Sequence, residues 1–206
     1  YAAIGFALAS AISAATLLPL AMDGGQIHSQ INWIPILNIK AGVLVDSLSI
    51  FMANIVAWIS LLIFIYSLGY MHGDRDLTRY WFLMLFFIGS MQLIVFSDNF
   101  LMLFFGWEGV GFASFALISF WYHDRKKDFV GTPGHYAGGI QMWASPSHAG
   151  LKAFLMTKAG DIMMLSGMFM IFMYSGTFGF RELLADQTWA HVMMQQNLLV
   201  PAAVLI

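Results

Sequence analysis

The sequence has no cysteine and little charge. Of its 206 residues, 10% are charged and 60% are hydrophobic, whereas an average soluble domain carries about 25% charged residues. The absence of cysteine excludes disulfides, thiolate chemistry and cysteine-held iron–sulfur clusters from this chain. The net charge of −2 leaves no basic face for binding nucleic acid. The composition therefore indicates a polytopic membrane protein that contacts the lipid bilayer.

Long apolar runs divide the chain into helices that can cross a membrane, for which about 20 residues suffice. The first run starts at Tyr1 with no methionine or charged leader, as is typical of a piece of a longer protein. We predict an all-α fold, a transmembrane helix bundle that forms a single domain over residues 1–206. The expected spans cover residues 1–22, 43–70, 80–96, 100–122 and 148–174, and a further helix starts at 198–206.

The polar segments between these runs are expected to lie outside the membrane. Residues 26–42 contain proline and asparagine and read as an ordered loop with room for short strands. Residues 123–147 read as a long loop, and 175–197 as an outer segment with a short surface helix at 180–184. Asp46 is expected to cap the start of the second span.

Glu108 is an acidic residue inside the fourth apolar run. An acidic side chain at the centre of a membrane helix costs roughly 2.5 to 3.5 kcal/mol, so an intramembrane carboxylate is by default a functional candidate. Gly106, Gly109 and Gly111 surround it, and small residues let neighbouring helices approach closely. We therefore expect Glu108 to face protein. The alternative is a neutral carboxyl group that only joins two helices by hydrogen bonds.

The fifth run carries Lys152, Lys158 and Asp161. Lys158 and Asp161 are spaced i, i+3, so they share a helix face and can form an ion pair inside the membrane. Lys152 lies near the helix start, where it can extend to the lipid headgroups. At 1.5 Å per residue, Glu108 lies about 12 Å from one face and Asp161 about 17 Å from the other, so their depths are similar.

Glu108, Lys158 and Asp161 are the candidate residues for proton translocation. Chains of buried ionisable groups build proton relays, because moving one charge changes the protonation of its neighbour. The alternative for Lys158 and Asp161 is a static ion pair that fastens two helices. The six histidines show no metal-ligand spacing, and the glycines around Glu108 follow no strand, so neither a metal nor a nucleotide site is predicted.

Several short segments, in order along the chain, form a recognisable set of motifs. They are residues 45–49 (VDSLS), 69–71 (GYM), 97–101 (SDNFL), 106–111 (GWEGVG) with 117–122 (LISFWY), 152–161 (KAFLMTKAGD) and 176–182 (GTFGFRE). Together they resemble the antiporter-like membrane subunit of complex I called subunit L or subunit 5.

The resemblance implies a subunit of fourteen or more helices that moves protons through intramembrane glutamate and lysine residues. It matches Glu108 to the key glutamate, Asp161 to the helix aspartate, and Lys158 to a position usually held by arginine. Lysine keeps the charge there but loses bidentate geometry. The resemblance also places one family helix before Tyr1, and beyond Ile206 a central lysine that pairs with the glutamate.

This resemblance implies a proton-translocating subunit of a complex I-like NADH:quinone oxidoreductase in an energy-transducing membrane, in particular a prokaryotic cell membrane. We expect no cofactor on this chain; a quinone-like acceptor, flavin and iron–sulfur clusters are expected on partner subunits, beside further membrane subunits. The alternatives are the large subunit of a multisubunit sodium/proton antiporter and a subunit of a membrane-bound hydrogenase. Co-purification of iron–sulfur proteins separates the first reading from the antiporter.

The lysines and arginines between spans indicate the orientation. Alternate connections place Arg75, Arg79 and the run 125–127 on one side, but only Lys40 and Arg181 on the other. The positive-inside rule then places the first set in the cytoplasm.

A cysteine that replaces Lys126 is therefore expected to resist a membrane-impermeant thiol reagent added to intact cells, whereas a cysteine that replaces Arg181 reacts. Labelling of each variant before and after cell lysis measures this difference. Reaction at position 126 in intact cells would reverse the orientation.

Overall fold

The computed structural model describes residues 2–37 and 39–206. Within these residues, five helical stretches are long and apolar enough to cross a membrane. The first is Ala2–Met22, which consists of α1 (Ala2–Thr16) and α2 (Leu18–Met22). The others are α3 (Ser47–Tyr70), α4 (Leu77–Phe96), α5 (Phe100–Ile118) and α6 (Pro146–Ser175). The predicted class, a bundle of membrane-spanning helices, is confirmed.

The remaining elements lie between or after the long helices. Two antiparallel hairpins are formed by β1 (Ile27–Ile34) with β2 (Ile39–Val45), and by β3 (Val130–Ala137) with β4 (Ile140–Ala144). Short 3₁₀ turns occupy Pro35–Leu37 and Lys126–Asp128. After α6 come α7 (Phe180–Ala185), α8 (Thr188–Gln195) and α9 (Leu199–Leu205).

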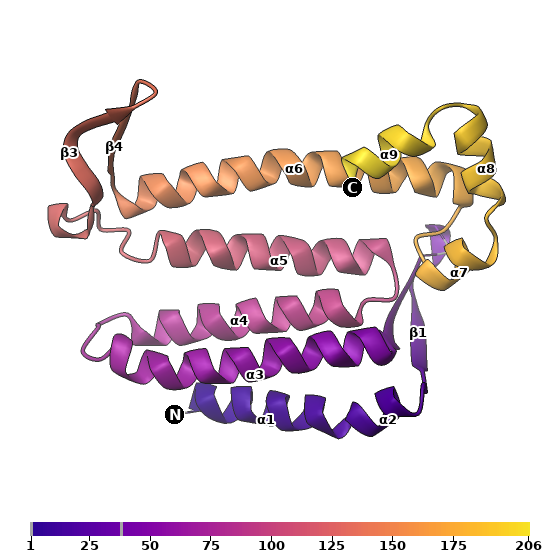
Figure 1. Cartoon of the computed structure of the whole chain (residues 1–206), viewed down its shortest axis with the longest axis horizontal. Helices are drawn as coiled ribbons and strands as arrows, with labels where there is room; N and C mark the ends of the chain where they lie inside the picture. The colour runs from indigo at the N-terminus through magenta and orange to yellow at the C-terminus, as the bar shows by residue number, and fades with distance from the viewer. Residues whose placement is uncertain (1, 38) are drawn as a thin grey trace.

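The long helices lie side by side in chain order, each antiparallel to the next (Figure 1). The β1–β2 hairpin, α7 and α8 gather at one end of this layer, which we call the hairpin end. The α3–α4 turn and the connection from α5 to α6 lie at the other end, which we call the basic end because it carries Arg75 and the run 125–127. The β3–β4 hairpin projects from the basic end, and α9 packs on α6.

Two predicted spans were too long. Residues 43–46 belong to strand β2 and to the cap of α3, because Val43 and Leu44 pair with β1 and the Asp46 carboxylate accepts the backbone N–H of Ser49 at 2.8 Å. The predicted cap at Asp46 is thereby confirmed. The fourth helix ends at Ile118 and not at 122, since the Ser119 hydroxyl bonds the Phe115 carbonyl at 2.7 Å and the chain then turns.

Two other predicted spans were too short. Helix α4 begins at Leu77, three residues before the predicted start. Helix α6 covers Pro146–Ser175, because Ser145 caps it, Pro146 occupies its first turn and Gly176 ends it with a left-handed backbone at φ +71°. The first span contains a break at Leu17, just before Pro19.

The predicted loop over 123–147 contains the β3–β4 hairpin. Its two-residue turn is Gly138-Gly139, with φ angles of +58° and +80°. Positive φ at both central residues is the geometry that hairpin turns of type I′ require, and glycine adopts it without strain. The Gly138-Gly139 pair therefore indicates a hairpin, which the sequence analysis missed because it treated the whole polar segment as a loop.

Small residues set the distances between helices. In the contact of α1 with α3, Ala7, Ala11 and Ala57 are buried. In the contact of α5 with α4, a Cβ atom added at Gly106 would lie 2.9 Å from both the Ile94 nitrogen and the Ser90 carbonyl oxygen. One added at Gly109 would lie 2.3 Å from the Ser90 hydroxyl. The predicted close approach is thus confirmed for these two glycines.

Replacing Gly106 by alanine is expected to destabilise the protein by roughly 1–3 kcal/mol, the usual cost of overpacking, because two of the three nearest obstructing atoms belong to the α4 backbone. Gly89→Ala is the matched control, since nothing lies within 4 Å of an added Cβ there. Thermal unfolding of both variants in detergent measures the difference. Equal midpoints for the two would show that Gly106 does not set the α4–α5 distance.

Candidate functional site

Glu108, Lys158 and Asp161 meet where α5 packs on α6. The Lys158 ammonium group donates to Glu108 Oε2 and lies 2.8 Å from Asp161 Oδ2. The Lys158 and Glu108 side chains are 25% and 33% exposed, whereas that of Asp161 is 6% exposed. The pairing predicted from the i, i+3 spacing of Lys158 and Asp161 is confirmed, and the structure adds Glu108 as a second carboxylate on the same lysine.

Asp161 has a second donor, Trp107. The indole Nε1–H donates to Asp161 Oδ1 at 2.9 Å, so the two oxygens of this carboxylate bind two different groups. Sequence reasoning did not assign a role to Trp107. The available signal was an indole N–H inside an apolar run, since a buried indole usually finds an acceptor.

The spacing of residues on α5 explains how Glu108 reaches α6. Gly106 and Gly109 contact α4. Glu108 and Gly111, three residues apart, lie instead on the side of Lys158, and a Cβ added at Gly111 would lie 3.9 Å from the Lys158 ammonium nitrogen. The glycines therefore have two functions: two of them bring α4 close, and the third leaves space beside the lysine.

The three side chains form a cluster with unequal charge. One ammonium group faces two carboxylates, so the cluster carries a net charge of −1 when all three are ionised. A net charge is costly inside a membrane, and a proton on one carboxylate removes it. Because Asp161 is held by both Lys158 and Trp107, Glu108 is the carboxylate with fewer stabilising contacts in its ionised form.

The resemblance assigned Glu108 a cationic partner beyond Ile206. That partner stays a prediction, because it lies outside this sequence; within the described residues, Lys158 binds Glu108, a contact that the sequence did not predict. The reason is geometric: the i, i+3 rule describes contacts along one helix, whereas the rotation of α5 against α6 decides which side chains meet between helices. Lys152, on the same helix as Lys158, is exposed, and its place near the headgroups stays a prediction.

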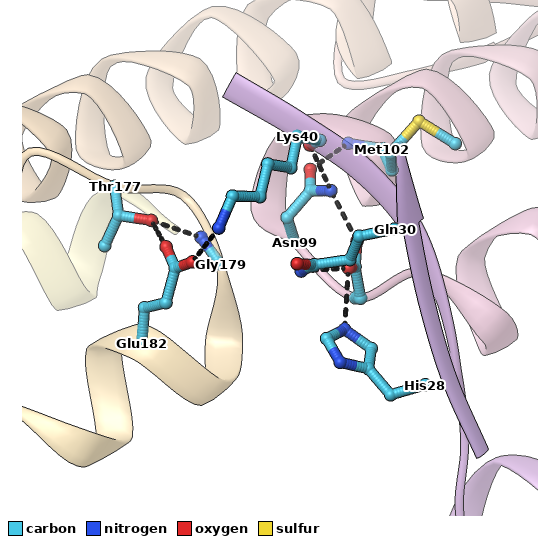
Figure 2. A network of polar contacts seen from close by, with 9 residues as sticks. His28, Gln30, Lys40, Asn99, Met102, Thr177, Gly179 and Glu182 are labelled. Carbon is cyan, nitrogen blue, oxygen red and sulfur yellow. Dashed lines mark hydrogen bonds and ion pairs between the residues drawn. The ribbon is translucent and has the colours of Figure 1, made fainter. Parts of the chain in front are cut away.

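A second polar network, which we call the outer network, lies at the hairpin end (Figure 2). Its centre is Asp98, which is 1% exposed. The Asp98 carboxylate lies 3.0 Å from the His28 ring nitrogen Nε2 and accepts a hydrogen bond from the Gln30 amide at 2.7 Å. Asn99 donates to Asp98 at 2.6 Å and to the Lys40 carbonyl oxygen at 3.1 Å. The network thus fastens the β1–β2 hairpin to the turn that starts α5. The sequence analysis used residues 97–101 only for the family resemblance and predicted no buried network there.

Glu182 continues this network toward α7. Its carboxylate lies 3.0 Å from the Lys40 ammonium nitrogen and accepts from the Thr177 hydroxyl. The Thr177 hydrogen bond, followed by Lys40, holds the pKa of Glu182 below its ordinary value. Asn99 caps the start of α5. Glu108 lies nine residues further on, about 14 Å along the helix axis. The outer network and the lysine cluster are therefore separate sites.

Within residues 2–37 and 39–206, no three histidine, aspartate or glutamate side chains come together in a way that could hold a metal ion.

Two protein-family profiles match the chain. Residues 33–81 match "NADH-Ubiquinone oxidoreductase (complex I), chain 5 N-terminus", and residues 137–206 match "NADH:quinone oxidoreductase/Mrp antiporter, TM".

Curated relatives give the same assignment. NADH-quinone oxidoreductase subunit L of Escherichia coli (strain K12) is 30% identical over 203 residues, which are 97% of this chain and 30% of that protein. Subunit L of Rickettsia conorii is 34% identical over 168 residues, or 80% of this chain and 23% of that protein. The chain thus spans about a quarter of the length of the curated relatives it matches.

Solved structures share the fold. The Mrp complex from Dietzia sp. DQ12-45-1b matches with a TM-score of 0.67 and 24% identity over 98% of this chain and 22% of that one. An archaeal membrane-bound sulfane sulfur reductase matches with a TM-score of 0.62 and 22% identity over 97% of this chain and 28% of that one. The chain therefore shares its fold with chains of these two complexes.

The chain belongs to the family of antiporter-like membrane subunits that includes subunit L, or chain 5, of complex I. With five apolar helices of spanning length, it is an integral membrane protein of a prokaryotic cell membrane.

Replacing Lys158 by methionine is expected to destabilise the protein by about 3 kcal/mol, because two carboxylates then lose their cation. Adding Asp161→Asn to that variant recovers part of the loss, since one uncompensated charge is removed. Lys152→Met is the matched control on the same helix and leaves stability unchanged, because Lys152 is exposed. Thermal unfolding in detergent measures these three variants and Asp161→Asn alone. Losses that simply add in the double variant would show that Lys158 and Asp161 do not act as a pair.

Proposed function

We propose that this chain is part of a proton-translocating membrane subunit of a complex I-like respiratory oxidoreductase. It carries no redox step itself, and electron transfer in other subunits drives its proton movement. The observation that carries the proposal is the sharing of one lysine by two carboxylates between two membrane helices. Such a cluster has a place for one mobile proton, whereas a static ion pair of one acid and one base has none.

In this proposal Glu108 carries the proton. When the Lys158 ammonium group is close, it stabilises the Glu108 carboxylate and the proton leaves. When Lys158 turns toward Asp161, Glu108 loses its cation in surroundings of low dielectric constant and takes up a proton. Asp161, which accepts a hydrogen bond from the Trp107 indole, stays ionised and binds the Lys158 ammonium group when that group leaves Glu108. A lysine in the chain beyond Ile206 would compete with Lys158 for Glu108, as the family resemblance implies.

We further propose that residues 1–206 form part of one transmembrane domain and that other membrane subunits adjoin it. The relatives support this, since the curated relatives are named as subunits and the solved structures are titled as complexes. Flavin, iron–sulfur clusters and the quinone-like acceptor are assigned to partner subunits.

The second candidate function is the large subunit of a multisubunit sodium/proton antiporter. It is favoured by the family profile over residues 137–206, whose description names both complex I and the Mrp antiporter. Purification of the native assembly separates the two functions. Peripheral iron–sulfur proteins in the purified assembly support the oxidoreductase, whereas small membrane subunits alone support the antiporter.

Glu108→Gln is expected to leave assembly intact and to lower proton pumping at least tenfold, because glutamine keeps the size and hydrogen bonding but cannot titrate. Glu108→Asp keeps partial pumping, since the carboxylate is only shortened. The control is Glu182→Gln at the chain's other glutamate, which lies in the outer network and leaves pumping unchanged. Proton uptake by inverted membrane vesicles, with assembly measured on the same membranes, gives the result. Full pumping by a fully assembled Glu108→Gln protein would falsify the relay role.

A further inference from the structure

The basic end lies at the opposite end of the layer from the β1–β2 hairpin (Figure 1). A charged cleft of 450 Å³ lies there. The α3–α4 turn forms one wall, and the segment that follows α5 forms the other. Its charged lining residues are Asp74, Arg75, Asp76, Arg125, Lys127 and Asp128, and Trp121 lies beside them. None of these residues belongs to the lysine cluster or to the outer network.

The walls of the cleft are joined by specific contacts. Trp121 Nε1 donates to Asp74 Oδ2 at 3.2 Å and so connects the two walls. Behind them, the Arg79 guanidinium group donates to the Phe120 carbonyl oxygen and lies 4.5 Å and 4.6 Å from the ring centres of Phe120 and Tyr122. Cation–π contacts of this kind fix the loop against α4. The cleft is thus preformed.

The carboxylates and the cations of the cleft differ in their contacts. Asp74 accepts from the Asp76 backbone N–H at 2.9 Å as well as from Trp121, and these bonds hold the pKa of Asp74 below its ordinary value. Asp76 lies 3.5 Å from Arg79. Arg75, Arg125 and Lys127 are exposed and, within residues 2–37 and 39–206, their side chains make no hydrogen bond or ion pair. Three cations and three carboxylates therefore line the cleft, and among the described residues Asp74 and Asp76 already have partners, whereas the Asp128 side chain makes no hydrogen bond or ion pair.

An adjoining hollow leads from the cleft to the membrane span. It measures 340 Å³, shares Gly73, Asp74 and Trp121 with the cleft, and extends to Tyr70 at the end of α3. The Tyr70 ring is 61% exposed and stacks on that of Tyr66, itself 69% exposed, with 5.8 Å between ring centres. An exposed tyrosine track on a span, beside an interfacial tryptophan, is a surface for lipid. A charged cleft that opens onto it suits an amphipathic ligand.

We propose that this cleft binds the phosphate headgroup of an anionic glycerophospholipid, whose acyl chain lies along Tyr70 and Tyr66. Arg75, Arg125 and Lys127 supply the charge that recognises the phosphate, and basic pockets on the cytoplasmic side of membrane helices suit such headgroups. The tyrosine track distinguishes a lipid from free phosphate, which has no apolar part to place there. The orientation predicted from the lysine and arginine distribution puts the site in the cytoplasmic leaflet, where anionic lipids attract basic residues.

The test uses the full-length protein in its native complex, with a photoreactive phosphatidylglycerol that carries the reactive group in its acyl chain. After illumination, mass spectrometry of peptides measures labelling of the segment that contains Tyr66 and Tyr70. Arg125→Gln combined with Lys127→Gln is expected to weaken labelling about 25-fold, at roughly fivefold for each basic residue removed near the surface. Arg75→Gln, from the other wall, weakens it about fivefold.

Lys126→Gln is the matched control, because Lys126 lies between the two altered positions but does not line the cleft. It leaves labelling within twofold of the unmodified protein. Equal loss in Lys126→Gln, unchanged labelling in the double variant, or equal labelling by a phosphatidylcholine probe would overturn the site. Suppression by millimolar inorganic phosphate would assign the cleft to the free ion, and labelling only after neighbouring subunits are removed would assign it to a protein contact. Arg75→Gln decides the case should the double variant fail to assemble.

Discussion

The contact on which the rest of the site depends is that of Lys158 with two carboxylates. Charges inside a membrane are tolerated when they are paired, and removing one member of a buried pair costs more than the pair contributes. Here the pairing is unequal, since Glu108 and Asp161 share one cation. The Trp107 indole makes the two acids inequivalent by binding only Asp161. An unequal cluster with inequivalent members has two arrangements available to it, which is the physical requirement for a switch.

Two backbone hydrogen bonds at the start of α5 hold the side chains of the lysine cluster at the same level. The Phe100 backbone N–H donates to the Phe178 carbonyl oxygen at 3.1 Å, and the Phe180 N–H donates to that of Asp98 at 3.0 Å. These two bonds join the start of α5 to the segment that follows α6. Because α5 and α6 are connected at this end, Glu108 cannot slide along the helix axis relative to Lys158 without breaking them. These backbone contacts, about 14 Å from the cluster along α5, therefore maintain its geometry.

The sequence predicts those features that depend on one segment at a time. Apolar runs indicate the spans, Asp46 the cap, and the i, i+3 spacing the pair of Lys158 with Asp161. Contacts between segments required the structure. The bond of Lys158 to Glu108 depends on how α5 is rotated against α6, and the partners of Asp98 come from a hairpin some 70 positions earlier. Strand β2 was merged with a span because Val43 and Val45 suit both a β-strand and an apolar helix.

The central claim is that Glu108 gains and loses a proton while Asp161 stays ionised. Infrared difference spectroscopy of the full-length protein in its working complex tests this directly, because a protonated carboxyl group has a C=O stretching band that a carboxylate lacks. The account predicts a carboxyl band that appears on turnover, is absent in Glu108→Gln and persists in Glu182→Gln. A turnover-dependent band that is unchanged in Glu108→Gln would contradict it.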